Sequence, residues 1–107
     1  MNSYNQKILI VDDIEDNRFT LERRLSRNGY TAISQADCGK KALELVKEER
    51  FDLILLDLMM PDISGLDVLK TLKADPKSRS IPVVMVTAAD EIETTAECIS
   101  NGAEDYI

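Results

Sequence analysis

The chain has 107 residues, of which 44% are hydrophobic and 31% are charged, as in an ordinary globular protein. This length allows one domain with a hydrophobic core and leaves no room for a second. The 20 acidic and 13 basic side chains give a formal net charge of −7. That balance argues against non-specific nucleic-acid binding by this segment.

Strands and helices are expected to alternate along the chain. Short apolar or β-branched runs predict strands, and apolar residues three or four apart predict helices. In chain order, strands are expected at 8–11, 31–36, 53–56, 83–87 and 105–107, and helices at 14–28, 39–49, 65–73 and 90–101. The segment 31–36 is polar enough to be an edge strand. The alternation predicts the α/β class, with a doubly wound, five-stranded parallel sheet between helical layers.

The first expected helix carries an aromatic side chain away from its apolar face. Ile14, Leu21 and Leu25 form one helical stripe, and Gly29 is expected to end the helix. Phe19 falls nearly opposite that stripe, so its ring should be exposed. A single exposed apolar side chain usually has no function. The alternative is that Phe19 contacts a partner.

Cysteine usage and hydropathy indicate the cellular compartment. Cys38 and Cys98 are far apart, no CxxC spacing occurs, and the chain has no histidine, which argues against a zinc site. Residues 1–6 are polar and do not resemble a signal peptide. No apolar run approaches the length that spans a membrane. We therefore expect a cytoplasmic domain with no membrane contact.

Three acidic residues follow two of the apolar strands. Asp12 and Asp13 come directly after 8–11, and Asp57 comes directly after 53–56. The carboxyl ends of parallel strands meet at one edge of a sheet, where the functional crevice of such folds lies. Three carboxylates there would repel one another without a cation, and oxygen ligands favour Mg²⁺. A simpler interpretation of Asp12 or Asp13 alone, as the N-cap of the following helix, stays open.

These acids belong to an ordered set of motifs, which are Asp12-Asp13, Asp57 with Pro61 and Gly65 behind it, Thr87-Ala88, and Gly102-Ala103 before Asp105-Tyr106. Through them the chain resembles the receiver (phosphoacceptor) domain of two-component response regulators over essentially its whole length. The resemblance implies a flavodoxin-like fold of the receiver type. It also implies that Asp57 accepts a phosphoryl group, and a carboxylate can form such an acyl phosphate.

The resemblance assigns a role to each acidic residue. Asp13 and Asp57 would bind Mg²⁺ directly, Asp12 would act mainly through water, and the backbone carbonyl of Met59 would complete the protein ligands. Mg²⁺ is the only cofactor expected. Pro61 and Gly65, by contrast, are expected to shape the loop and the start of the next helix.

Two further residues are implied as a switch. Thr87 would hydrogen-bond a phosphoryl oxygen, and the small Ala88 beside it would leave room for the incoming group. Tyr106 matches the aromatic residue that turns inward when receivers are phosphorylated, although it could also be a core residue. Signalling contacts, including an optional homodimer, would then use the helix at 90–101 and the fifth strand.

The chain departs from the receiver pattern at its C-terminal end. Receivers carry a lysine just past the fifth strand and then a fifth helix. By spacing, the lysine would fall two positions beyond Ile107. We expect residues 1–107 to be one receiver domain that is truncated within or just after the fifth strand, so the last helix is missing. We also expect apolar sheet surface to be left uncovered as a result.

The function implied is a phosphorylation-activated switch of a two-component phosphorelay. Its phosphodonor would be a sensor histidine kinase or a histidine phosphotransfer protein, and Phe19 is a candidate contact for that donor. The domain would not be an enzyme beyond catalysing its own aspartyl phosphorylation and dephosphorylation. We expect an N-terminal receiver of a longer regulator, with a nucleotide cyclase, a cyclic-dinucleotide enzyme or a kinase as output. The alternatives are a stand-alone adaptor or phosphate sink, and a pseudo-receiver that is never phosphorylated.

Three enzyme or cofactor classes fit less well. A haloacid-dehalogenase phosphatase needs a second Asp where this chain has Met59. A flavodoxin-like flavin binder needs a phosphate loop rich in glycine and hydroxyl groups, but residues 12–15 carry three acids. A dinucleotide-binding domain needs GxGxxG, and the turn after the first strand has no glycine.

Overall fold

The computed structural model describes residues 6–58, 60–86, 99–103 and 105–106. Its elements, in chain order, are β1 (Ile8–Val11), α1 (Glu15–Arg27), β2 (Ile33–Ala36), α2 (Gly39–Glu48), β3 (Leu53–Asp57), α3 (Gly65–Ala74), β4 (Val83–Val86) and β5 (Asp105–Tyr106). All strand pairs are parallel, in the order β2-β1-β3-β4-β5. This is the flavodoxin-like order of a doubly wound sheet, so the predicted fold class is confirmed.

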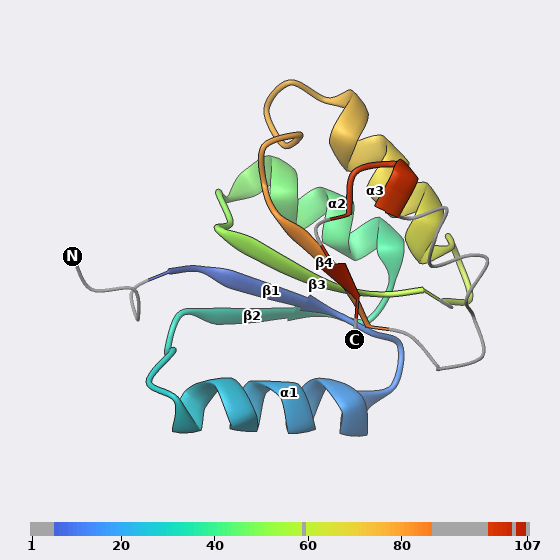
Figure 1. Ribbon diagram of the computed structural model, residues 1–107. Coiled ribbons are helices and arrows are strands. Elements are labelled where there is room, and N and C mark those ends of the chain that lie inside the picture. The colour runs from blue at the N-terminus through green and yellow to red at the C-terminus, as the bar shows by residue number, and fades with distance from the viewer. Residues whose placement is uncertain (1–5, 59, 87–98, 104, 107) are drawn as a thin grey trace.

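The helices lie in two layers (Figure 1). Helix α1 covers one face of the sheet, and α2 and α3 cover the other. Side chains alternate between the faces along each strand. Leu9 and Leu56 therefore belong to the larger core cluster under α2 and α3, and Ile8, Ile10 and Leu55 form the smaller cluster against α1.

The α1 face of the sheet is the less covered one. On β4, Val83 and Met85 point to the larger cluster and are 0% and 1% exposed. Val84 and Val86, on the α1 side, are only half-buried. Helix α1 itself has no fully buried residue. In the described residues, this face is thus covered thinly toward β4.

The start of the first helix differs from the prediction. Ile14 was expected in the apolar stripe, but it precedes α1 as its N-cap residue and is 52% exposed. The β/extended backbone of Ile14 (φ −99°, ψ 117°) takes its side chain out of the helical pattern. Leu21 and Leu25 do pack against the smaller cluster. Gly29, at φ 95°, ends the helix as predicted, because few residues other than glycine adopt that conformation easily.

Two further expectations concern the sheet edge and the helix after β4. The polar strand predicted at 31–36 begins at Ile33 and is the edge strand, as expected. Most of the helix predicted at 90–101 lies outside the described residues. Ile99 and Ser100 are helical, and Gly102 follows at φ 106°, consistent with its predicted role as a stop. No helix in the described part of the chain has the length and apolar character to cross a membrane.

The N-terminus of α2 is held by a side chain from another loop. Its own N-cap residue, Cys38, makes no side-chain cap bond. Instead, the Asp62 carboxylate accepts hydrogen bonds from the backbone N–H of Gly39 (3.1 Å) and Lys40 (2.9 Å). These bonds, led by that from Lys40, lower the pKa of Asp62 from 3.8 to about 2, against the opposing effect of desolvation. Asp62 therefore stays ionised well into the acid range.

Replacing Asp62 with Asn should remove an acid-sensitive part of the stability. A carboxylate with a lowered pKa stabilises the fold fully above its unfolded value, near 3.8, and loses this effect as the pH falls toward about 2. We expect wild type to melt above Asp62→Asn at neutral pH and the difference to close between about pH 4 and pH 2. Thermal unfolding followed by circular dichroism measures this difference. If the difference in Tm between wild type and Asp62→Asn were as large at about pH 2 as at neutral pH, the ionised Asp62 carboxylate would not be its cause.

Candidate functional site

The pairing of β1 with β3 brings the predicted acidic residues together. Val11 is the register partner of Leu56, so the residues that follow them, Asp12 and Asp57, leave the two strands at the same level. Asp57 is in turn paired with Val86 of β4. The carboxyl ends of three adjacent strands thus lie at one edge of the sheet. This is the edge at which the sequence predicts a site.

The carboxylates of Asp12, Asp13 and Asp57 form a compact cluster. One oxygen atom of each lies within 4.8 Å of the other two. Asp12 is 2% exposed, Asp57 is half-buried and Asp13 is exposed. Three ionised carboxylates at this spacing repel one another, and the repulsion is relieved by a divalent cation with a preference for oxygen ligands. The donor set therefore suits Mg²⁺, and the exposed Asp13 leaves the cluster open to solvent.

Asp12 is the most firmly held of the three acids. Its carboxylate accepts a hydrogen bond from the backbone N–H of Ile14 (2.9 Å) and a longer one from the Asn17 side-chain amide (3.3 Å). The Arg18 guanidinium donates to the Asp12 backbone carbonyl at 2.7 Å and to the side chain of Gln35 on β2. These contacts fix the turn between β1 and α1.

The capping alternative for Asp12 and Asp13 is not what the structure shows. The N-cap position of α1 is Ile14, and its side chain makes no cap bond. The bond from Ile14 N–H to Asp12 shapes the turn before the helix and leaves Asp13 exposed. Asn17 and Arg18 lie on the first turns of α1 and hold Asp12 in place, a role that was not predicted from the sequence. Their spacing of five and six residues from Asp12 is the only sequence signal for this role.

Gly65 allows the start of α3 to lie against the backbone of Asp57, the candidate phosphoacceptor. A side chain at this position would collide with the carbonyl oxygen of Asp57, and its Cβ would lie 2.8 Å from the Cα of Leu58. The N–H of Gly65 donates to the Leu58 carbonyl at 2.7 Å. Helix α3 starts here with Ser64 as its N-cap, accepting from the N–H of Asp67. The predicted structural role of Gly65 is thus explained by its contact with Asp57.

Other residues that the sequence marked are placed only in part. Met59, Thr87 and Ala88 lie outside the described residues. Tyr106 belongs to β5, where it pairs with Met85, but its side chain is also outside the described part of the structure. Pro61 is exposed in the loop between β3 and α3. The geometry therefore bears on the acidic cluster and leaves the proposed switch residues as predictions.

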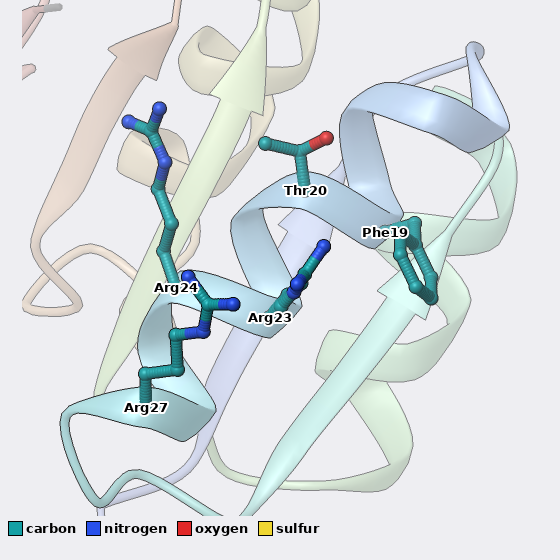
Figure 2. Close-up of a pocket in the computed structure, with 5 residues that line it drawn as sticks. All are labelled: Phe19, Thr20, Arg23, Arg24 and Arg27. Atoms are coloured by element: carbon teal, nitrogen blue, oxygen red, sulfur yellow. The ribbon is translucent and has the colours of Figure 1, made fainter.

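A second surface feature lies along α1. Phe19 is 61% exposed, as predicted, and forms a shallow pocket of about 290 Å³ with Thr20, Arg23, Arg24 and Arg27. Figure 2 shows the five side chains on successive turns of the helix, with Phe19 at one end and Arg27 at the other. Among the described residues, no salt bridge involves these three arginines. In a chain of net charge −7, α1 therefore presents a basic surface with an aromatic end.

Comparison with known proteins agrees with this geometry. The sequence model of one protein family, described as the response regulator receiver domain, matches residues 8–107 of this chain. The chain is 42% identical over 101 residues to the response regulator PleD of Caulobacter vibrioides, covering 94% of this chain and 22% of PleD. It is 37% identical to the chemotaxis protein CheY-3 of Vibrio cholerae, covering 96% of this chain and 79% of CheY-3.

Solved structures give the same result. The N-terminal domain of a response regulator receiver protein from Methanoculleus marisnigri superposes with a TM-score of 0.86 at 36% identity, covering 95% of this chain and 82% of that one. The strand order, the acidic cluster at the carboxyl ends of β1 and β3, and these matches lead to one conclusion. The chain belongs to the response regulator receiver domain family.

Proposed function

We propose that this chain is the phosphoacceptor switch of a two-component phosphorelay, with Asp57 as the residue that is phosphorylated. The observation that carries the proposal is the grouping of Asp12, Asp13 and Asp57 within 4.8 Å at the carboxyl edge of the sheet. Asp57 ends β3 and is half-buried, so its carboxylate is both held in place and reachable.

The reaction requires little covalent chemistry from the protein. A carboxylate oxygen of Asp57 attacks the phosphorus of a phosphohistidine, an O–P bond forms, the N–P bond breaks, and the donor's imidazole leaves. Bound Mg²⁺ would neutralise charge on the phosphoryl oxygens. Asp12, Asp13 and Asp57 are the described residues that would hold it, and the Met59 carbonyl is the further ligand that we propose. Asn17 and Arg18 act indirectly, because they hold Asp12 and its turn.

Thr87 and Tyr106 are proposed as the residues that respond to phosphorylation. Thr87 follows Val86, which pairs with Asp57, so its position in the sequence suits contact with the phosphoryl group. Tyr106 follows on the neighbouring strand β5. A local charge change that biases a two-state element is the usual basis of such switches. The helix predicted at 90–101 and β5 would then carry the signal, including any homodimer.

The phosphodonor is proposed to be a sensor histidine kinase or a histidine phosphotransfer protein that contacts α1. Phe19 supplies an exposed aromatic anchor, and Arg23 beside it would attract acidic side chains of the donor. The charge of this helix face, opposite in sign to the chain as a whole, supports an acidic partner surface.

The proposed setting is the N-terminal receiver of a longer cytoplasmic regulator. The chain spans 22% of the length of PleD, and its proposed outputs are a nucleotide cyclase, a cyclic-dinucleotide enzyme or a kinase. The second candidate, a stand-alone adaptor or phosphate sink, is favoured by the 79% coverage of CheY-3. In neither setting would the receiver be an enzyme beyond its own phosphorylation and dephosphorylation. The presence of all three acids counts against a pseudo-receiver.

Asp57 should take up one phosphoryl group from acetyl phosphate or phosphoramidate in the presence of Mg²⁺. Intact-mass spectrometry should show the added group on wild type and none on Asp57→Asn. Asp52→Asn is the matched control, because Asp52 directly precedes β3 at the opposite end of the same strand and should label normally. Equal labelling of Asp57→Asn and wild type would refute the assignment.

Mg²⁺ should raise the thermal stability of wild type, because it binds the clustered carboxylates of the native state only. At a free concentration about ten times the Kd, the expected stabilisation is about 1.4 kcal/mol, which corresponds to several degrees in Tm. Asp13→Asn should lose most of this shift, since it removes a direct ligand. Thermal unfolding with and without Mg²⁺ measures the effect. A shift of full size in Asp13→Asn would rule out direct coordination by Asp13.

Phe19→Ala should slow phosphotransfer from a phosphorylated kinase about tenfold, as expected if an aromatic anchor worth about 1.4 kcal/mol is lost. Its labelling by acetyl phosphate should be unchanged, because the acidic cluster is untouched. Ile99→Ala is the matched control, since Ile99 is another exposed apolar residue at 42% exposure. The kinase for this test is the one that phosphorylates wild type fastest among a panel of histidine kinases. If Phe19→Ala slowed phosphorylation by the kinase and by acetyl phosphate equally, Phe19 would affect folding or the acidic cluster itself.

A further inference from the structure

The loop between β3 and α3 connects the acidic cluster to the rest of the fold. It leaves Asp57 and runs to Ser64, the N-cap of α3. The hydrogen bond from the Gly65 N–H to the Leu58 carbonyl closes the loop at its base.

Asp62 holds the far side of this loop. Its Oδ1 accepts from the N–H of Gly39 at 3.1 Å and its Oδ2 accepts from the N–H of Lys40 at 2.9 Å. Each carboxylate oxygen thus takes one backbone donor from the first turn of α2. These donors have no partner within their own helix, and an anionic acceptor also suits the positive end of the helix dipole.

The cap joins two segments that are far apart in the sequence. Lys40 lies 22 residues before Asp62, and Gly39 lies 23 residues before it. Asp37, just before the N-cap residue Cys38, is an exposed acid that could have supplied a local cap. The structure uses the distant Asp62 instead, so the bonds restrain the loop as well as the helix. Packing supports the same junction, because a Cβ on Gly39 would come within 2.8 Å of Val68 on α3 and 3.2 Å of Ile63 in the loop.

We propose that Asp62 is a positioning residue that fixes the loop after Asp57 against the N-terminus of α2 and thereby sets the affinity of the acidic cluster for Mg²⁺. The bond from Gly65 to the Leu58 carbonyl and the Asp62 cap hold the two ends of the loop that starts at Asp57. When the cap is lost, the loop gains freedom and the cation loses part of its preformed site. This inference rests on the proposed Mg²⁺ site, and it adds a residue that does not touch the metal.

The test is the Kd for Mg²⁺, measured by calorimetric titration of wild type, Asp62→Ala and Asp62→Asn. Residues that orient metal ligands from outside commonly change affinity by tenfold or more. We expect Asp62→Ala to raise the Kd about tenfold. Asp62→Asn should fall between the two, because its amide oxygen still accepts one backbone N–H. At saturating Mg²⁺, the rate of labelling by acetyl phosphate should stay near that of wild type in both variants.

Two control variants separate positioning from charge and from stability. Asp67→Asn removes an exposed acid from the first turn of α3 and reports the effect of charge alone. Asp52→Ala removes an exposed carboxylate that accepts the Lys7 N–H at 2.9 Å at the opposite end of β3, and reports the effect of losing a similar bond. Both controls should keep a Kd within about twofold of wild type.

The outcomes distinguish this inference from the proposed function. If wild type binds Mg²⁺ and Asp62→Ala binds it equally well, the positioning role is wrong and the proposed function stands. The positioning role is also wrong if Asp67→Asn or Asp52→Ala weakens binding as much as Asp62→Ala does. Failure of wild type itself to bind Mg²⁺ would overturn both. If Asp62→Ala does not fold, Asp62→Asn decides between these outcomes.

Discussion

The parallel pairing of β1 with β3 is the interaction on which the rest of the site depends. Both strands are buried, and the register Val11 to Leu56 brings their carboxyl ends to the same level. The apolar side chains of these strands make the centre of the sheet stable in a single register, because a slip by one residue would turn its core side chains to the other face. The same register carries Asp12 and Asp57 to adjacent positions. The core of the protein thus places its acidic residues.

Grouping three carboxylates opposes folding, and the fold limits this cost in two ways. The almost fully buried Asp12 is held by hydrogen bonds from the backbone N–H of Ile14 and the side-chain amide of Asn17. Asp13 stays exposed, so water screens part of the repulsion. The remaining repulsion would be relieved by the divalent cation that we propose for this site. The three carboxylates would repel a phosphoryl group by themselves, and the site would attract one only when that cation is bound.

Support from neighbouring backbone is as important as the acids themselves. Gly65 allows the start of α3 to lie directly against Asp57, at a distance that no side chain would permit. Asp62 joins the same loop to α2, and its lowered pKa keeps this link charged at all but the most acid pH. Helix α3 is therefore in backbone contact with Asp57, and α2 is joined to the loop that follows Asp57 by the Asp62 carboxylate. Helix α1, on the other face of the sheet, carries the separate basic surface lined by Arg23, Arg24 and Arg27.

The sequence by itself determined the class of fold, the edge position of β2, the stop at Gly29 and the meeting of the three acids. Each follows from a local pattern or from the rule that parallel strands share one carboxyl edge. It placed Ile14 wrongly, because helical spacing does not show where the backbone turns before the first residue of α1. Only the tertiary structure showed that Asn17 and Arg18 hold Asp12, and that Asp62 caps a helix that begins 23 residues earlier. The Asp62 contact depends on how separate segments approach in space, which no periodicity along the chain encodes. The short spacing of Asn17 and Arg18 from Asp12 does not by itself specify a hydrogen bond.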